Sequence, residues 1–157
     1  ALALFSSLSV SANQDAEVLG VTFGSTCEET VQKLNKDYGT PKSQSADKLV
    51  YLNEMFEGFK ADRVELGFQD LQGTTKLNQA RFYFVCPNKA AAIARMKSLV
   101  KKMETRYSVS YDEEDGGTAF YKGGNSPLGI GCLFTIFVSP YQGKWTCQLR
   151  YGKFQFK

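Results

Sequence analysis

The chain contains no histidine among its 157 residues. This absence excludes Ser-His-Asp and Cys-His catalysis, imidazole metal sites and histidine-based acid–base chemistry. The chain also lacks any run of the roughly 18 apolar residues that a membrane-spanning helix needs. The sequence therefore predicts a protein that does not span a membrane and that uses no metal or other cofactor.

Cysteine is scarce, and the four cysteines form no Cys-x-x-Cys pair; they are Cys27, Cys86, Cys132 and Cys147. A zinc ribbon or a thioredoxin-type redox site is therefore not indicated. In an exported chain, four cysteines can form two disulfides with any of three connectivities. The alternative is that some of them are buried thiols, which pack like small apolar residues.

The chain also has little net charge. A formal net charge of +3 is too mild for the basic stripe expected of a nucleic-acid binder. Aromatic residues make up 13% of the chain, which indicates an ordered globular core rather than disorder. The expected partner is a protein or a cell-envelope component, with no nucleic acid, and the sequence leaves the oligomeric state open.

The opening stretch ALALFSSLSVSA is apolar, small and uncharged. Val10 and Ala12 occupy the −3 and −1 positions of a small-residue cleavage pattern, and the polar NQDAE follows. We interpret residues 1–12 as the remnant of a secretion signal that is cleaved after Ala12; the alternative is a first strand or a short buried helix. No cysteine follows for lipid attachment. Residues 13–157 are then one periplasmic or secreted domain.

A first helix is predicted in STCEETVQKLNKDYGTP. Ser25 and Glu28 have capping-box spacing, and Gly39 and Pro41 end the pattern. Its apolar stripe consists of Cys27, Val31, Leu34 and Tyr38. Cys27 is therefore expected to face the core.

A second helix is predicted from Pro87 and Asn88 to about Tyr107. Its apolar stripe consists of Ile93, Met96, Val100, Met103 and Tyr107. Its outer face carries Lys97, Lys101, Lys102 and Arg106. Such a face is usually solvated, and the alternative is contact with an anionic surface.

Alternating segments between and after the helices predict strands. Val64, Leu66 and Phe68 alternate with polar residues, and in NQARFYFVC the residues Phe82 and Phe84 share a side with Cys86. In the last hairpin, a turn at PYQG would place Ile136 opposite Cys147 and Cys132 opposite Tyr151. A 132–147 disulfide is therefore not expected, because bridged residues need Cα atoms closer than about 7 Å.

The chain contains a weak internal repeat. At an offset of 69 residues, VQKLNKDY (31–38) matches VKKMETRY (100–107), VYL (50–52) falls on AFY (119–121), and Phe68 falls on Phe137. A single offset that aligns a helix and two strands indicates duplication. The predicted fold is α+β: two α-β-β-β repeats, at about 18–86 and 87–157, forming a largely antiparallel sheet with two helices packed on one face.

That architecture leaves the other sheet face partly open. By alternation, Arg81, Tyr83, Phe137 and Arg150 are candidates to lie there. Arginine and aromatic side chains are the usual anchors of protein interfaces, so these four are the predicted binding residues. The alternative is that a loop or an N-terminal strand covers the face, or that these are scattered surface residues.

The stretch GVTFGSTCEETVQKLNKDYGTP resembles the opening of a group of small exported bacterial domains. Their pattern of a Gly, a short strand, a helix and Gly-x-Pro is matched here by Gly20, Phe23, Leu34, Gly39 and Pro41. The group includes the β-lactamase inhibitor protein, which is a tandem repeat, and the small lipoprotein subunit of the outer-membrane barrel-assembly machinery. The resemblance implies a non-catalytic module that binds protein or envelope components across a sheet face, with no functional residue carried over.

Two stretches suggest enzymatic or ligand chemistry but lack its required pattern. DEEDGG (112–117) lacks the spaced oxygen ligands of a calcium loop, so an acidic turn is favoured. GGNSPLGIG (123–131) lacks the Gly-Lys-Ser/Thr and the helix that a phosphate loop needs. We therefore predict a non-enzymatic exported interaction module. The alternatives are a small-ligand or envelope-glycan binder with a cleft between repeats, and a hydrolase with two carboxyls about 5–10 Å apart.

Overall fold

The computed structural model describes residues 16–113 and 119–157. The elements in chain order are β1 (Glu17–Val18), β2 (Val21–Thr22), α2 (Cys27–Tyr38), β3 (Ser43–Gln44), β4 (Lys48–Phe56), β5 (Phe59–Leu71), β6 (Thr74–Cys86), α3 (Lys89–Glu104), β7 (Val109–Glu113), β8 (Ala119–Gly123), β9 (Phe134–Tyr141) and β10 (Lys144–Gly152). The predicted secretion signal, residues 1–12, lies outside the described residues, as do residues 114–117 of the acidic stretch. No helix of the described ranges is both long and apolar enough to cross a bilayer.

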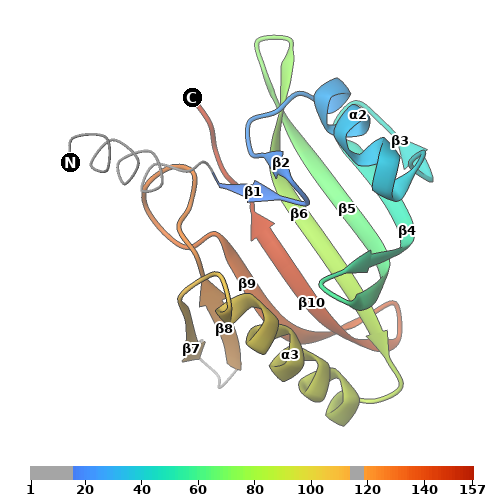
Figure 1. The fold of residues 1–157 in the computed structure, drawn as a ribbon, viewed down its shortest axis with the longest axis vertical. Helices are drawn as coiled ribbons and strands as arrows, with labels where there is room; N and C mark the ends of the chain where they lie inside the picture. The colour runs from blue at the N-terminus through green and yellow to red at the C-terminus, as the bar shows by residue number, and fades with distance from the viewer. Residues whose placement is uncertain (1–15, 114–118) are drawn as a thin grey trace, which may run out of the picture.

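Eight strands form one antiparallel sheet in the order β3-β4-β5-β6-β10-β9-β8-β7, and β1 pairs with β2 in a small second sheet. Each helix is followed in the chain by four strands, and the two groups of four meet where β6 pairs with β10 at the centre of the large sheet (Figure 1). The sequence analysis predicted three strands for the first group and missed β3. That strand is only two exposed residues long, so it has no apolar alternation to reveal it.

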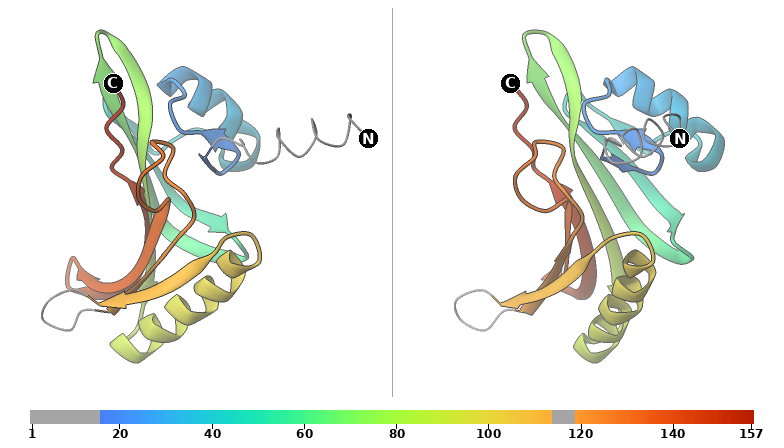
Figure 2. Two further views of the ribbon diagram at one scale, coloured as in Figure 1. Left: turned by 90° about the vertical axis from the view of Figure 1, so that its left-hand side faces the viewer. Right: turned by 60° about the vertical axis from the view of Figure 1, so that its left-hand side comes forward.

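Both helices lie on the same side of the large sheet (Figure 2). The core forms between them and the sheet, and its fully buried side chains include Tyr51, Phe82, Phe84, Ile136 and Leu149. The predicted α+β class, with a largely antiparallel sheet and two helices on one face, is confirmed. Deeply buried side chains of this size each contribute about 1.5–3 kcal/mol by leaving water.

The start of α2 lies one residue later than predicted. Thr26, and not Ser25, is the N-cap: its side chain accepts a hydrogen bond from the Glu29 amide at 3.1 Å, and Glu29 accepts one from the Thr26 amide at 2.9 Å. The capping box is therefore Thr26 with Glu29. Gly39, with φ of 70°, ends the helix as predicted.

Helix α3 begins after Asn88, whose side chain accepts a hydrogen bond from the Ala91 amide at 2.8 Å. It ends at Glu104, three residues before the predicted end. The last turn closes because the amides of Arg106 and Tyr107 both donate to the Met103 carbonyl, at 3.1 and 2.9 Å. Tyr107 still packs against the core, which is why it fitted the apolar stripe.

The register of the β9–β10 hairpin differs by two residues from the prediction. Ile136 pairs with Leu149, and Val138 pairs with Cys147. The reason is the turn: Gln142 and Gly143 both have positive φ, 52° and 77°, so a two-residue turn replaces the four-residue turn at PYQG. The shift is even, so the side chains keep their predicted faces. Cys132 precedes β9 and is not opposite Tyr151.

Candidate functional site

The strand register places two rows of side chains on the sheet face that points away from the helices. One row, across β9, β10, β6 and β5, consists of Phe137, Gln148, Tyr83 and Arg63. The neighbouring row consists of Thr135, Arg150, Arg81 and Glu65. Directly opposite residues of an antiparallel pair point to the same side. We call these eight residues, together with Tyr141, the open face.

All four sequence-predicted residues, Arg81, Tyr83, Phe137 and Arg150, lie on the open face. On β6, Arg81 and Tyr83 alternate with Phe82 and Phe84, which are buried on the helix side. Among residues 16–113 and 119–157, no helix or strand lies over the open face (Figure 2). Alternation along the strands was therefore sufficient to predict the face on which the four lie. The strand pairing brings them together, and their role in binding stays a prediction.

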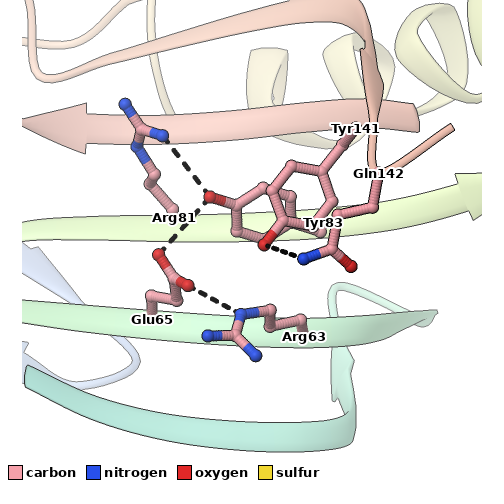
Figure 3. A network of polar contacts seen from close by, with 6 residues as sticks. All are labelled: Arg63, Glu65, Arg81, Tyr83, Tyr141 and Gln142. Carbon is pink, nitrogen blue, oxygen red and sulfur yellow. Dashed lines mark hydrogen bonds and ion pairs between the residues drawn. The ribbon is translucent and has the colours of Figure 1, made fainter. Parts of the chain in front are cut away.

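A polar network links the open face across β5 and β6 (Figure 3). Arg63 Nε lies 2.6 Å from Glu65 Oε2 in a partly buried ion pair. The Tyr83 hydroxyl donates to Glu65 Oε1 at 3.4 Å and accepts from Arg81 Nη1 at 3.4 Å. Glu65 is thus shared by a guanidinium and a phenol, which fixes the orientation of the residues around it.

Tyr83 is the buried centre of this network. Only 2% of its surface is exposed, and the ring of Tyr141 packs against it at an interplanar angle of 37°, with a centroid distance of 4.5 Å. Burial raises the pKa of the Tyr83 phenol above its ordinary value. Tyr83 therefore lies beneath Tyr141, and the partly exposed Tyr141 is the ring that this part of the open face presents to solvent.

Arg150 and Phe137 form the other half of the open face. The Arg150 guanidinium carbon lies 4.9 Å from the centre of the Phe137 ring, within the range of a cation–π contact. Both side chains are partly exposed. This pair places a cation and an aromatic ring beside Arg81, which is opposite Arg150 on β6.

The open face has an excess of positive charge. It contains three guanidinium groups, of Arg63, Arg81 and Arg150, and a single carboxylate, of Glu65. The Nε of Arg81 is buried and has no hydrogen-bond partner among the described residues. Arginine is suited to carboxylate recognition because its planar fork donates two parallel hydrogen bonds.

Sequence reasoning missed Arg63, Glu65 and Tyr141. The alternation in ADRVELGFQD was used for its buried residues, and the same pattern puts Arg63 and Glu65 on the opposite side. Tyr141 had no such signal, because the sequence analysis placed it inside the turn rather than in β9.

Thiol chemistry has little support in the structure. All four cysteines are free thiols, so the two-disulfide alternative is not found and the buried-thiol alternative applies to Cys86 and Cys147. Burial raises the pKa of Cys147 to about 12, and burial also raises the pKa of Cys27. A reactive cysteine needs a lowered pKa, and these two thiols have the opposite shift.

A cleft lies on the helix side of the sheet. It has a volume of about 1450 Å³ and lies between the β1–β2 hairpin, the segment after α3 and the β8–β9 loop. Its polar lining includes Arg106, Ser108, Lys122 and Asn125. Arg106 is ion-paired with Glu57, and Lys122 Nζ lies 2.8 Å from Asp112 Oδ2. The cleft lining therefore contains hydroxyl and amide groups and two cations that are already ion-paired with carboxylates.

Within the described ranges, no three His, Cys, Asp or Glu side chains are close enough together to hold a metal ion. Comparison of the chain with protein-family models, curated proteins and solved structures gives no match.

Proposed function

We propose that the chain is a non-enzymatic interaction module that binds a protein partner through the open face. The observation that carries the proposal is that Arg63, Arg81, Phe137 and Arg150 lie in two adjoining rows, with Tyr141 beside them and no described helix or strand above them. Arg, Tyr and Phe are enriched at the energetic centres of protein interfaces.

The open face is also held in place before a partner arrives. Glu65 fixes Arg63, Tyr83 supports Tyr141 from below, and Phe137 supports Arg150. Immobilising a flexible side chain on binding costs about 0.5–1.5 kcal/mol. Side chains that are already ordered avoid part of that cost, which favours a binding role for this face.

We further propose that the domain is a tandem duplication. Two observations support the proposal: the same order of one helix and four strands occurs twice, and the sheet order is mirrored about the β6–β10 pair. The offset of 69 residues also relates Arg81 to Arg150, which pair with each other at that centre. A duplicated unit would thus supply each half of the open face.

The proposed setting is the periplasm or the medium outside the cell, because of the predicted signal at residues 1–12. The partner is then a protein of the cell envelope or a secreted protein. Its contact groups are expected to be acidic and apolar, to complement the arginines and the rings of the open face.

Photo-cross-linking in the cells that make the protein tests the proposal. We would place p-benzoylphenylalanine at Phe137 or Tyr141 on the open face, and at Lys36, an exposed residue of α2, as the control. The expected result is one dominant protein adduct from both open-face positions and none from Lys36. Arg81→Gln in the same chain is expected to reduce the adduct at least tenfold.

The proposal would be wrong if a folded protein gave no adduct from the open face, or the same adducts from all three positions. Circular dichroism and the thermal midpoint of each variant establish that it is folded. The control matters because a photo-cross-linker on any exposed surface captures abundant proteins by random encounter.

A second candidate function is binding of a small ligand or an envelope glycan in the cleft beside the β8–β9 loop. The cleft volume of about 1450 Å³ and its hydroxyl and amide lining favour it. Titration with a soluble peptidoglycan fragment tests it: shifts of the Ser108, Gly124 and Asn125 amide resonances support it, and their absence contradicts it. The cleft contains one carboxylate among its described lining residues, Glu17, so a two-carboxylate hydrolase gains no support there.

A further inference from the structure

Helix α3 carries a larger net positive charge than the chain as a whole. Its sixteen residues include five bases and one acid, an excess of four. The whole chain has a formal net charge of only +3. The remainder of the chain is therefore slightly acidic, and the charge of the molecule is strongly asymmetric.

The bases of α3 divide into two groups. Arg95 and Lys89 are engaged with aromatic rings: Arg95 lies 4.8 Å from the centre of Phe59, and Lys89 lies 5.4 Å from that of Trp145. The other three, Lys97, Lys101 and Lys102, are exposed. We call these three the lysine face.

The lysine face points away from the core. The buried residues of α3 are Ala92, Met96, Leu99, Val100 and Met103. With 3.6 residues per turn, they form one stripe against the sheet, which leaves the lysines on the outer surface. Figure 2 shows α3 at the edge of the molecule, on the side of the sheet opposite the open face.

The ammonium groups of the lysine face make no hydrogen bond or ion pair with residues 16–113 and 119–157; the Thr105 hydroxyl donates only to the backbone carbonyl of Lys102. The next cation in the chain, Arg106, is ion-paired with Glu57. The three ammonium groups are therefore available to a partner outside the described chain.

The stability of the helix does not explain all three lysines. Lys101 and Lys102 lie in the last turn, where the helix dipole favours cations. Lys97 is not in that turn, and at i and i+4 it repels Lys101. The first turn of α3 also lacks the acidic residues that would stabilise it. A charge arrangement that costs local stability is typical of a functional surface.

We propose that the lysine face docks the protein on an anionic membrane surface by binding lipid phosphates. Lysine ammonium groups are compact point charges that suit phosphate headgroups, and clusters of them on a helix are attracted to anionic lipid. The exposed residues beside them are small, Ala90, Ala94 and Ser98, so a flat surface can approach closely. None of the exposed large apolar side chains of the described residues lies on α3.

The lack of exposed aromatic side chains on α3 favours a lipid surface over single-stranded nucleic acid as the anionic partner. Single-stranded nucleic acid is usually held by aromatic rings that stack on bases, and the exposed surface of α3 has none. Because the lysine face and the open face lie on opposite sides of the sheet, a protein docked through α3 keeps its open face available to a partner.

Co-sedimentation with vesicles tests this inference. The vesicles contain equal parts of phosphatidylglycerol and phosphatidylcholine, and phosphatidylcholine alone is the neutral comparison. The test variant is Lys97→Gln, Lys101→Gln and Lys102→Gln together. The matched control is Lys33→Gln, Lys36→Gln and Lys42→Gln, which removes the same charge from exposed positions on and after α2.

The wild-type protein is expected to sediment with the anionic vesicles at low salt and to be released as salt is added. It is not expected to bind the neutral vesicles. Each lysine near an anionic surface raises the membrane partition coefficient about fivefold. The test variant, which lacks three of them, is therefore expected to have a partition coefficient roughly 100-fold lower than wild type. The control variant is expected to stay within about fivefold of wild type, the effect of a single lysine.

Three results would overturn the inference. They are failure of the wild-type protein to bind anionic vesicles at low salt, equal losses in the two triple variants, and binding of a single-stranded oligonucleotide in preference to the vesicles. Thermal midpoints of both variants establish that they are folded, and substitutions of exposed lysines are not expected to unfold the domain.

Discussion

Arg81 and Arg150 are directly opposite each other across β6 and β10, at the centre of the eight-stranded sheet. Like charges in this position destabilise an antiparallel pair. Glu65, opposite Arg81 on the next strand, is the only carboxylate in the two central rows. Glu65 therefore helps to stabilise the open face against repulsion among its arginines.

We expect Glu65→Gln to lower the free energy of unfolding by about 1.5–3 kcal/mol, the usual value of a charge-assisted hydrogen bond. The Glu65 side chain is only 14% exposed, and it is bonded to both Arg63 and Tyr83. The variant should also gain stability from added salt, because the carboxylate beside Arg63 and Arg81 is removed and salt screens the repulsion among the arginines. Urea unfolding at low and high salt measures both effects.

Asp112→Asn is the matched control for that prediction. Asp112 lies 2.8 Å from Lys122, but both side chains are more than 40% exposed. Exposed ion pairs contribute little to stability. If Glu65→Gln proved as harmless as Asp112→Asn, the open face would not be organised around a buried carboxylate.

The N-cap of α2 gives a second prediction. Thr26→Ala should lower the free energy of unfolding by about 1 kcal/mol, because it removes the hydrogen-bond acceptor of the Glu29 amide. Ser25→Ala, one residue earlier, should change it by less than about 0.5 kcal/mol, as a surface substitution does. Equal losses in the two variants would contradict the observed cap. Thermal or urea unfolding of both proteins is sufficient.

The sequence predicted correctly that the α2 segment is a helix, but it placed the start of the helix one residue too early. The apolar stripe and Gly39 identified the helix, because periodicity and a stop signal are both local features. Two capping boxes, Ser25 with Glu28 and Thr26 with Glu29, fit the same sequence. Only the backbone geometry decides between them: Thr26 has the extended conformation that an N-cap requires.

The sequence predicted which residues lie on the open face, but it did not predict the contacts between them. Alternation in β6 and β10 put Arg81 and Arg150 on one side, and this needs no tertiary information. That these two residues are opposite each other depends on the pairing of β6 with β10, which are far apart in the chain. The contact between Tyr83 and Tyr141 was missed because it depends on a turn of two residues rather than four.

That turn gives a third prediction. Gln142 has φ of 52° and Gly143 has φ of 77°, the left-handed region that favours Asn followed by Gly. Gln142→Asn should raise the free energy of unfolding by a few tenths of a kcal/mol, and Gly143→Ala should lower it by about 1 kcal/mol. The β5–β6 turn at Gln72 and Gly73, with φ of 55° and 87°, should respond in the same way.

A four-residue turn at PYQG would give a different result, because it would not require left-handed backbone at both positions. Gly143→Ala would then be close to neutral. Nuclear Overhauser effects between Val138 and Cys147 across the hairpin test the register itself, since this is the pair that the two-residue turn creates.

The last prediction concerns the buried thiol of Cys147 and alkaline pH. Its pKa is raised from 9.0 to about 12 by burial. Between these two values the thiol ionises in the unfolded chain but not in the folded one, so the unfolded state holds fewer protons and stability falls as pH rises. Well below pH 9.0 the thiol is protonated in both states and adds no pH dependence.

Cys147→Ala should therefore make the fall in unfolding free energy above pH 9.0 less steep by up to about 1.4 kcal/mol per pH unit. Val64→Ala is the control, because it also trims a fully buried side chain but removes no titrating group. It should lower stability at every pH and leave the slope unchanged. Urea unfolding at a series of pH values measures the slopes, and iodoacetamide should label Cys147 only after unfolding. Rapid labelling of the folded protein, or equal slopes in wild type and Cys147→Ala, would mean that the thiol is accessible to solvent.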